Sequence, residues 1–505
     1  MDALPQQLYG IEASRELDRK AIDELGIPGY ELMCRAGQAA LTVLLRCWPR
    51  SQRLLVFCGS GNNGGDGYVL ATMARKLGLF VQVVTTGSAR SSECRQAAAD
   101  WLAAGGEICR LPAQAAAMVE WLAYADVVVD GILGTGVDRP VTGQLARLLA
   151  VINTAEIPVL ALDVPSGLHA QRGTILGVAV RAAATVAFIG LNQGLLTASG
   201  PACCGQIYFS SLQLPASLYQ GIASGAIRLG QRQIQESLPV RLQDAHKGQF
   251  GHVLVVGGDC GMSGAARLTA RAALSSGSGL VSLATHAGHA GNANTDCPEL
   301  MVIGLTGSDD PLLQRALDRA SVLALGPGLG QSNWGRKLFE HLRAFPGPMV
   351  VDADGLNLLA RDPDQNGDRI LTPHPAEAAR LLGVSTPEIQ QDRFSAVLSI
   401  ARRYAGVCVL KGAGTLIAGA DEQVWLCDRG DPGMATAGMG DVLTGIIAGL
   451  LAQGLGLIEA AQAGVWMHAV SAERHLGAYP GQVVRASVVA DHLDLTRPHA
   501  RLLRV

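Results

Sequence analysis

The sequence predicts an α/β protein built from two doubly wound domains. Apolar strands alternate with amphipathic helices along the chain, and this alternation restarts after about residue 232. Of the 505 residues, 49% are hydrophobic and 16% charged, which supports large buried cores. Strands that are apolar throughout and separated by helices form parallel sheets covered on both faces.

The first half is expected to begin with two helices, at residues 12–26 and 31–45. Leu17, Ala21, Ile22 and Leu25 fall on one face of the first helix. Strands are then expected at 53–58, 80–86, 126–133 and 158–164, and helices at 68–78, 94–106 and 142–155. The segment 214–232 has no strong periodicity and is rich in Gly, Ser and Ala. We therefore place a boundary there and expect domains at 1–222 and 223–505.

The second half repeats the same pattern. Strands are expected at 252–258, 279–285, 321–330, 348–356, 369–375 and 407–412. Helices are expected at 264–274 and 387–405. A hairpin is expected at 414–428, and two final helices begin near Gly438 and Leu457.

Composition argues against several classes of protein. The net charge is −3, with 40 basic and 43 acidic residues and no basic run, which excludes a nucleic-acid surface. No apolar stretch reaches about 18 residues, so no membrane span is expected. The N-terminal segment lacks the pattern of a signal peptide. None of the 11 cysteines forms a C-x-x-C pair, which is typical of a reduced, cytoplasmic protein.

Three glycine-rich loops follow strands of the first half. They read "GSGNNGGDG" (59–67), "DGILGTGVDRP" (130–140) and "LDVPSG" (162–167). Ligands of parallel sheets bind beyond the carboxyl ends of strands, and glycines let the backbone approach a pyrophosphate. The following helix offers free N–H groups to the same anion. The loops therefore predict a phosphate-bearing ligand. A tight turn without ligand is the alternative.

The first loop matches G-x-G-x-x-G, the pattern of nicotinamide-dependent dehydrogenases. Such a fold needs an acidic residue about 20 positions further on, at the end of the second strand, to hold the ribose. That strand ends in "VVTTGSAR", which contains no Asp or Glu. The loop is also unusually polar for such a turn. We therefore reject the dehydrogenase interpretation.

These motifs resemble the N-terminal domain of the YjeF family, the NAD(P)HX epimerases, which act on hydrated NADH or NADPH. The resemblance lies in "GNNGGDG", "VVVDGILGTG" and "LDVPSG", preceded by "GIPGYELMCRAG". It implies a Rossmann-like sheet, a proton transfer by Asp163 beside the nicotinamide ring, and a potassium ion held by Asn63, Asp130 and Ser166. The residues implied to contact the hydrate are Asn62, Asn63, Gly64, Gly65, Asp66, Gly134, Thr135, Gly136, Val137, Asp138, Arg139, Pro140 and Asp163. Cys34 departs from the family, which usually has Glu there.

The strongest motif of the second half is "ATAGMGDVLTGIIAGLL". Its turn, Gly438 to Gly440, leads into a helix whose first N–H groups can stabilise a phosphoryl group in transfer. Asp441 could accept the proton of an attacking hydroxyl. This motif resembles the ribokinase superfamily. The alternative is that Asp441 is an ordinary helix N-cap.

Neighbouring motifs favour the catalytic interpretation. "VLKGAGTLIAG", "GPGLG", "DADGLN", "TPHPAEAARLL" and "GGDCGMSGAARLTARAALSSGSGLV" are together similar to the C-terminal YjeF domain, the NAD(P)HX dehydratase. The resemblance implies a ribokinase-like sheet, with ADP as phosphoryl donor and Mg²⁺. The hydrate would contact Ala265, Gly328, His374 and Asp441. The nucleotide would contact Lys411, Gly412, Ala413, Gly414, Thr415 and Gly440. Ala376 departs mildly from the family, which often has Gly there.

The chemistry explains why a kinase-like site would serve a dehydratase. Hydroxide is a poor leaving group, and phosphorylation of the hydrate's hydroxyl makes a good one. The leading hypothesis is a bifunctional enzyme that interconverts R and S NAD(P)HX and dehydrates the S form, releasing AMP and phosphate. It would use only small-molecule substrates and form a homo-oligomer. Two alternatives stay open, a ribokinase-type small-molecule kinase with a regulatory domain, and a non-catalytic first domain. ADP or ATP, and NADHX or NADPHX, also stay open.

Overall fold

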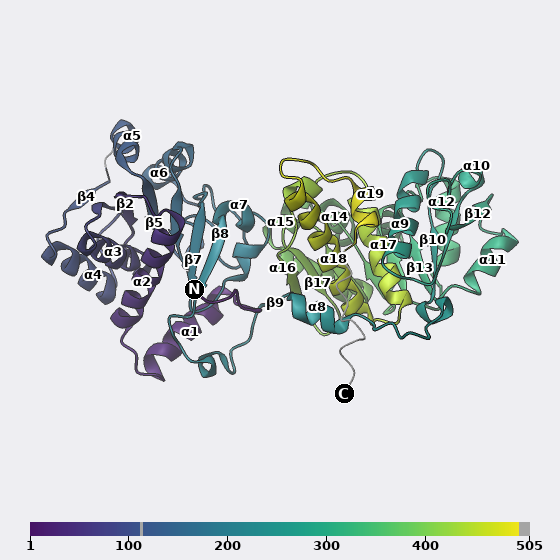
Figure 1. Cartoon of the computed structure of the whole chain (residues 1–505), viewed down its shortest axis with the longest axis horizontal. Helices are drawn as coiled ribbons and strands as arrows, with labels where there is room; N and C mark the ends of the chain where they lie inside the picture. The colour runs from purple at the N-terminus through teal and green to yellow at the C-terminus, as the bar shows by residue number, and fades with distance from the viewer. Residues whose placement is uncertain (112–114, 494–505) are drawn as a thin grey trace. The chain divides into compact units, whose positions relative to one another are not determined.

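The computed structural model describes residues 1–111 and 115–493 of the chain (Figure 1). The chain divides into two compact units, Met1–Ile227 and Arg228–Val505. Each unit contains a largely parallel sheet with helices packed against it. The predicted α/β class is therefore confirmed.

The sheet of the first unit is parallel throughout and has the order β4-β3-β2-β5-β6-β7-β8. From β2 the chain proceeds outward through β3 and β4, and then returns to the other side of β2 with β5. The point at which strand order reverses therefore lies between β2 and β5, where ligands of such sheets bind. The strands are β2 (Arg53–Cys58), β3 (Phe80–Thr85), β4 (Ile108–Arg110), β5 (Val127–Gly131), β6 (Val159–Leu162), β7 (Ala184–Phe188) and β8 (Gln206–Ser210).

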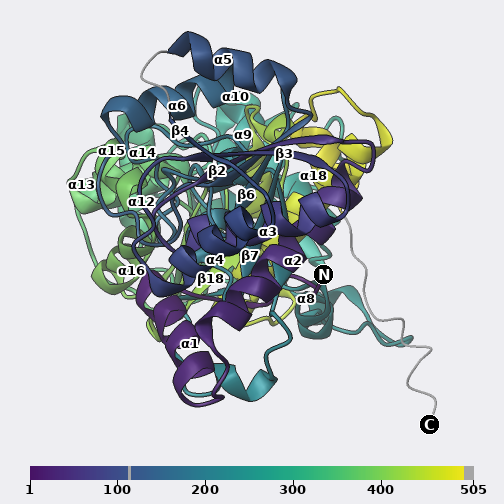
Figure 2. The same ribbon diagram turned by 90° about the vertical axis from the view of Figure 1, so that its left-hand side faces the viewer.

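Helices cover both faces of this sheet (Figure 2). Helices α2, α3 and α4 lie on one face, and α5 and α6 on the other. Alternate residues of β2 point to opposite faces, so Val56 packs with the first group and Phe57 with the second. The helices are α1 (Ile11–Asp23), α2 (Gly29–Cys47), α3 (Asn62–Lys76), α4 (Ser92–Ala103), α5 (Ala115–Tyr124), α6 (Gly143–Thr154) and α7 (Gly200–Cys204), with 3₁₀ turns at Gln193–Leu196 and Ala216–Tyr219. Two short strands, β1 (Gln7–Leu8) and β9 (Ala226–Arg228), pair antiparallel.

The sheet of the second unit has the order β18-β17-β16-β15-β14-β13-β10-β11-β12. It is parallel except for β17 and β18, which form the predicted antiparallel hairpin. Strand order reverses between β10 and β13. The strands are β10 (His252–Val256), β11 (Leu280–His286), β12 (Met301–Leu305), β13 (Val322–Leu325), β14 (Met349–Val351), β15 (Arg369–Leu371), β16 (Val407–Leu410), β17 (Thr415–Ala418) and β18 (Val424–Cys427).

Helix α17 lies at the centre of the second unit and is buried along almost its whole length. It can pack closely against α9 because residue 445 is a glycine. A Cβ at Gly445 would lie only 2.1 Å from the carbonyl oxygen of Thr269. No helix in the described part of the chain is long and apolar enough to cross a membrane. The helices are α8 (Gln231–Ser237), α9 (Ser263–Ser275), α10 (Ala287–Ala290), α11 (Pro311–Leu317), α12 (Asn333–Leu342), α13 (Ala353–Arg361), α14 (Pro375–Leu382), α15 (Thr386–Gln391), α16 (Arg393–Tyr404), α17 (Met439–Ala452), α18 (Leu457–Ala478) and α19 (Ala486–Asp491), with 3₁₀ turns at Lys247–Phe250 and Pro432–Met434.

Several local expectations are wrong. The strands expected at 321–330 and 369–375 already end at Leu325 and Leu371. Gly326 follows the first with a φ of 123°, and His374 caps a helix soon after the second. The segment 62–67 belongs to helix α3 and is not a loop, because its glycines pack tightly against neighbouring backbone and side chains. The expected strand 348–356 ends at Val351, and helix α13 begins at Ala353. The expected helix 387–405 is interrupted at Asp392, whose carboxylate accepts the N–H of Ser395 at 3.0 Å and starts α16 anew.

Candidate active sites

A cavity of about 780 Å³ opens in the first unit where β2, β5 and β6 end. Its volume lies within the range of about 300–1,000 Å³ common for small-molecule sites. The three glycine-rich segments all reach it, as the position of the strand-order reversal requires. The predicted residues that line it are Asn62, Asn63, Asp66, Gly134, Thr135, Gly136, Val137, Asp138, Arg139, Pro140 and Asp163.

Gly64 and Gly65 lie in the first turn of α3 and are not among the residues that line the cavity. A Cβ at Gly64 would lie 2.1 Å from the carbonyl oxygen of Gly59. A Cβ at Gly65 would lie 2.4 Å from the Met33 methyl group. Both glycines therefore let the start of α3 pack closely, and their predicted contact with the hydrate stays a prediction.

Three of the carboxylates that line this cavity have raised pKa values. Asp163 follows β6 with a left-handed φ of 62°, and burial, together with Asp18, raises its pKa to about 7. Burial raises the pKa of Asp66 well above its usual range, and the nearby Asp163 adds to this. The surrounding protein atoms partly desolvate Asp18 and raise its pKa to about 6, although the residue stays accessible to solvent in the cavity. Asp163 and Asp18 can therefore hold or release a proton near neutral pH.

Asp18 was not predicted from the sequence. It lies on the polar face of helix α1, far from the glycine-rich motifs in the sequence. Nothing in its local pattern distinguishes it from a solvated helix residue. Only the packing of α1 places it at the cavity.

The residues predicted to hold potassium form one buried cluster. Ser166 donates from its backbone N–H to Asp130 Oδ2 at 2.8 Å and from its hydroxyl to Asp130 Oδ1 at 2.6 Å. Asn63 donates from Nδ2 to the carbonyl oxygen of Leu133 at 2.8 Å, and the N–H of Leu133 donates to Ser166 Oγ at 2.8 Å. Asn63 Oδ1 is buried and has no hydrogen-bond donor. An unpaired buried oxygen beside a carboxylate and a hydroxyl suits an oxygen-seeking cation.

Cys34, the departure from the YjeF pattern, is partly buried on α2. It packs against the hydrophobic cluster between α2, α3 and the sheet. It is not among the residues that line the cavity, whereas Met33 and Ala36 are. At this position the chain uses the side chain for packing.

The second unit gathers its predicted hydrate contacts where β10, β13 and β15 end. Gly328 has a left-handed φ of 59°, and a Cβ there would lie 2.5 Å from the Met262 carbonyl oxygen and 3.3 Å from the Ala265 Cβ. His374 caps helix α14, since its Nδ1 accepts the N–H groups of Ala376 at 3.1 Å and Glu377 at 3.4 Å. Ala376 is accommodated in the first turn of that helix.

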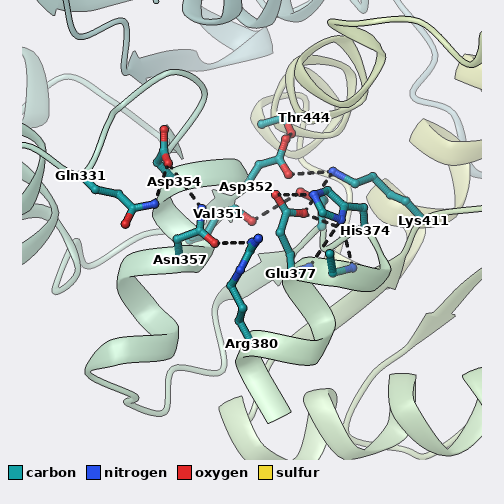
Figure 3. Close-up of polar contacts among 12 residues, drawn as sticks. Gln331, Val351, Asp352, Asp354, Asn357, His374, Glu377, Arg380, Lys411 and Thr444 are labelled. Atoms are coloured by element: carbon teal, nitrogen blue, oxygen red, sulfur yellow. Dashed lines mark hydrogen bonds and ion pairs between the residues drawn. The ribbon is translucent and has the colours of Figure 1, made fainter. Parts of the chain in front are cut away.

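A buried ionic cluster lies beside these residues (Figure 3). Lys411 Nζ donates to Asp352 Oδ1 at 2.9 Å and lies 3.9 Å from Glu377 Oε2. The Thr444 hydroxyl donates to Asp352 Oδ2 at 2.8 Å. Burial acts to raise the pKa of Asp352, but Lys411 and the hydroxyl hold it below its usual value. The two carboxylates likewise raise the pKa of Lys411 against the effect of burial, so the ammonium stays charged.

Asp441 lies in the first turn of α17, next to this cluster. The N-cap of α17 is Gly438, with φ 89° and no side-chain cap bond, so the alternative of Asp441 as the N-cap is wrong. Burial and the neighbouring Asp352 raise the pKa of Asp441 to about 7. A Cβ at Gly440 would lie 3.1 Å from Lys411 Nζ. The free N–H groups of the helix, the ammonium and a carboxylate that can accept a proton therefore lie side by side, as phosphoryl transfer requires.

Of the nucleotide contacts expected at 411–415, residues 411–414 lie in the turn between β16 and β17, and Thr415 is the first residue of β17. Gly412 and Gly414 have positive φ values of 140° and 62°, and the guanidinium of Arg393 lies beneath this turn, donating to the Leu410 carbonyl oxygen at 3.1 Å. Ala413 is exposed and Thr415 half-buried. Sequence reasoning missed Asp352, Glu377 and Thr444. An Asp directly after a buried strand was the one signal that could have indicated the first of them.

Comparison with known proteins decides the family. Residues 29–194 match the model described as YjeF-related protein N-terminus, and residues 253–490 match the one described as NAD(P)H-hydrate dehydratase. The chain is 45% identical over 467 residues to a bifunctional NAD(P)H-hydrate repair enzyme of Coxiella burnetii, covering 92% of this chain and 94% of that one. It is 41% identical over 473 residues to one of Escherichia coli, covering 93% and 90%. The chain belongs to the family of bifunctional NAD(P)H-hydrate repair enzymes.

Solved structures are similar to the second half of this repair-enzyme chain. A ribokinase-like superfamily protein from Enterococcus faecalis is 28% identical with a TM-score of 0.49, covering 52% of this chain and 93% of that one. An ADP/ATP-dependent NAD(P)H-hydrate dehydratase from Bacillus subtilis, co-crystallised with ATP and Mg²⁺, is 30% identical with a TM-score of 0.47, covering 51% and 92%. The family prediction made from the motifs is confirmed by the full-length relatives.

Proposed function

We propose that this chain repairs hydrated NADH and NADPH in two steps. The first unit interconverts R and S NAD(P)HX, and the second dehydrates the S form with ADP, releasing AMP and phosphate. The observation that carries the second step is the position of Asp441, a carboxylate with a pKa of about 7 beside Lys411 at the start of α17. The kinase alternative shares this geometry and differs in the fate of the phosphorylated product.

Dehydration begins with Asp441 accepting the proton of the hydrate's hydroxyl, whose oxygen then bonds to the terminal phosphorus of ADP as AMP leaves. Lys411 and the N–H groups at the start of α17 are placed to stabilise the charge on the transferred group. The ring nitrogen then expels phosphate from the carbon that carried the hydroxyl. Loss of a proton from the adjacent carbon restores the dihydropyridine ring. Lys411, Gly412, Ala413, Gly414, Thr415 and Gly440 are proposed to hold the nucleotide.

Epimerisation needs a group that takes the hydroxyl proton of the hydrated carbon and delivers a proton to the ring nitrogen, so that the C–N bond opens to an aldehyde. The reverse proton transfers accompany reclosure on the other face. Asp163 is proposed for this role because its pKa of about 7 permits both directions of transfer at neutral pH. Burial and the nearby Asp18 hold the pKa of that carboxyl high, and the raised pKa of Asp66 favours its neutral form beside it. The buried Asn63 Oδ1, Asp130 and Ser166 would hold a potassium ion, which would supply a fixed positive charge for the phosphates of the hydrate.

The potassium proposal has a direct test. Exchange of K⁺ for Na⁺ should slow epimerisation in the native chain, and Asn63→Leu should abolish the difference between the two cations. An epimerisation rate equal in both salts would contradict the site. Dehydration of the S form, measured in the same preparations, serves as the control because it uses the other unit.

Magnesium is proposed to accompany the nucleotide. Mg²⁺ usually binds substrate phosphates together with one or two carboxylates, and Asp352, Glu377 and Asp441 supply such oxygens beside Lys411. When bound, it would neutralise charge on the phosphates. Activity should therefore be lost with a chelator and return with added Mg²⁺.

The activity itself is tested with purified chain, ADP, Mg²⁺ and a mixture of both epimers. Recovery of the absorbance of reduced nicotinamide, with one AMP and one phosphate released per molecule restored, is the expected result. Stable accumulation of a phosphorylated hydrate would favour the kinase alternative. The same assay with ATP measures the preference for the donor.

We also propose a reducing, cytoplasmic location and a homo-oligomer. All 11 cysteines are free thiols, which supports the first proposal. Leu77 and Phe80 are 63% and 73% exposed, and we propose that a second copy covers them. Light scattering of the wild type and of Phe80→Lys tests the second proposal, which a monomeric wild type would contradict.

A further inference from the structure

The second unit contains a cavity of about 400 Å³ that none of the predicted contacts occupies. It is formed by the segment after β13 together with helices α13 and α14. The residues that line it are Gln331, Asn357, Ala360, Arg361 and Arg380. Every lining side chain except Ala360 is polar, and both charged ones are guanidinium groups.

The two arginines bring positive charge that no direct ion pair neutralises, although Arg380 acts at longer range on Glu377. Among residues 1–111 and 115–493, no carboxylate oxygen lies within the 4.0 Å of an ion pair from either guanidinium. Each instead donates to a neutral amide oxygen, Arg380 to Asn357 at 2.8 Å and Arg361 to Gln331. Other arginines of this unit, such as Arg343 and Arg369, are paired with aspartates. A cavity with two unpaired guanidinium groups favours an anion.

The amides that hold these arginines are themselves fixed (Figure 3). Asp354 Oδ1 accepts from Gln331 Nε2 at 3.3 Å and from Asn357 Nδ2 at 3.4 Å. Asp354 Oδ2 accepts the N–H of Gly330 at 3.0 Å. Because both amide NH₂ groups point to Asp354, both amide oxygens point to the arginines. The guanidinium groups are therefore oriented before any ligand binds, with N–H donors left over.

The same segments carry the proposed contacts with the hydrate. Gln331 directly follows the Gly326–Gly330 turn, which contains Gly328. Arg380 lies on α14, which His374 caps, and six residues of α-helix span about 9 Å. A dinucleotide bound with its nicotinamide ring at Gly328 and His374 carries its phosphates at a comparable distance from that ring. The phosphates of ADP, in contrast, are proposed to lie at Lys411 and Gly440.

We propose that Arg361 and Arg380 form a subsite for a phosphate group of the dinucleotide hydrate. The inference rests on the proposed dehydration of NAD(P)HX by this unit. The planar guanidinium fork matches the geometry of phosphate oxygens, and two such groups in one cavity suit a dianionic group. The phosphate is either the 2′-phosphate present only in NADPHX or the pyrophosphate common to both hydrates.

Steady-state dehydration by the full-length chain tests this subsite. Arg361→Gln, Arg380→Gln and the double variant are compared with wild type for S-NADHX and S-NADPHX at saturating ADP. Loss of one charge-assisted hydrogen bond should raise KM for the hydrate about tenfold while kcat changes less than about twofold. A rise for NADPHX alone assigns the 2′-phosphate, and an equal rise for both hydrates assigns the pyrophosphate.

Controls separate the subsite from a structural effect. Arg315→Gln, an exposed arginine on α11, should leave every parameter unchanged. KM for ADP should stay the same in all variants. If Arg380→Gln does not fold, the salt dependence of KM in the wild type replaces it, since added salt screens a phosphate–guanidinium contact and should raise KM for the hydrate.

The proposal would be overturned if the variants left KM for both hydrates unchanged, or if only KM for ADP rose. It would also be overturned if the wild-type KM for the hydrate did not depend on salt. Dehydration by the wild type, measured in the same series, tests the proposed function separately from the phosphate subsite.

Discussion

Asp163 and Asp441 are the two residues on which the proposed chemistry depends. Both are aspartates whose pKa burial raises to about 7, and each lies at the carboxyl ends of strands in its own unit. At neutral pH both protonation states of each are populated, which suits groups that accept and return protons. Their electrostatic surroundings differ, however. Asp163 faces other carboxylates, whereas Asp441 lies between Asp352 and the ammonium of Lys411.

The pH dependence of dehydration should report Asp441. A general base must be unprotonated, so the rate should fall as pH is lowered through about 7, the value to which burial raises this pKa. Asp441→Asn should lower kcat by about 10²–10⁴ and leave a residual rate without that acidic limb. Asp421→Asn, on the exposed hairpin turn, is the matched control. An unaltered acidic limb in Asp441→Asn would assign the proton transfer to another group.

Asp352 should matter chiefly for stability and nucleotide binding. Asp352→Asn removes the partner that lies 2.9 Å from the Lys411 ammonium and leaves this largely buried charge only Glu377 at 3.9 Å. Breaking one side of a buried ion pair costs about 3–5 kcal/mol. Thr444→Val removes only a hydrogen bond to the same carboxylate and should cost about 1 kcal/mol. Urea unfolding of the second unit measures both, and equal losses would contradict this assignment of roles.

At the residue scale, sequence motifs identified the polar side chains that follow strands but not their partners. Asn63, Asp130, Asp163 and Asp441 could be named because each belongs to a glycine-rich segment. Asp18 and Glu377 could not, since an acidic residue within a helix is usually solvated. Their importance depends on how α1 and α14 pack, which no short sequence window contains.

Helix α3 is the element that shapes the first site. It begins directly after Gly61, so Asn62, Asn63 and Asp66 are presented from a helical turn and not from a flexible loop. Glycine-rich sequence ordinarily disfavours helix, by about 1 kcal/mol per glycine relative to Ala. Here glycine is required at positions 64 and 65 because they lie close to Gly59 and Met33. The local sequence pattern was misleading because this requirement comes from tertiary packing.

The glycines of α3 should tolerate substitution very differently. Gly64→Ala would place a methyl group 2.1 Å from a backbone oxygen that cannot move freely, so epimerisation and thermal stability should both fall sharply. Gly61→Ala, with nothing within 4 Å of its Cβ and a φ of −100°, should keep nearly wild-type stability. Melting curves and epimerisation rates compare the two. Similar behaviour of both variants would contradict the packing argument.

Most elements could be predicted because their periodicity is strong. The β2 strand agrees with its expected range residue for residue, and the hairpin of β17 and β18 lies where alternating apolar residues flank a polar turn. Strands β7 and β8 were not predicted. The short apolar segments that form these strands lie among other apolar and small residues, so the sequence pattern does not mark them out. Only their pairing with neighbouring strands distinguishes them from loops.

At the scale of the whole molecule, each unit has its own hydrophobic core and its own site. Residues of the epimerase cavity all come from the first unit, and residues of the ionic cluster all come from the second. A substitution in one site should therefore leave the chemistry of the other unchanged. The two activities are coupled by the substrate, because one unit supplies the epimer that the other consumes.

The most direct test of this account is the initial rate of each reaction with separated epimers, measured for wild type, Asp163→Asn and Asp441→Asn. Asn tolerates the left-handed backbone at position 163, so folding should be preserved. The account predicts that Asp163→Asn dehydrates the S hydrate normally but no longer accelerates conversion of R to S. Asp441→Asn should do the reverse. If either substitution abolished both reactions, or if R converted at the wild-type rate without Asp163, the assignment of one reaction to each unit would be contradicted.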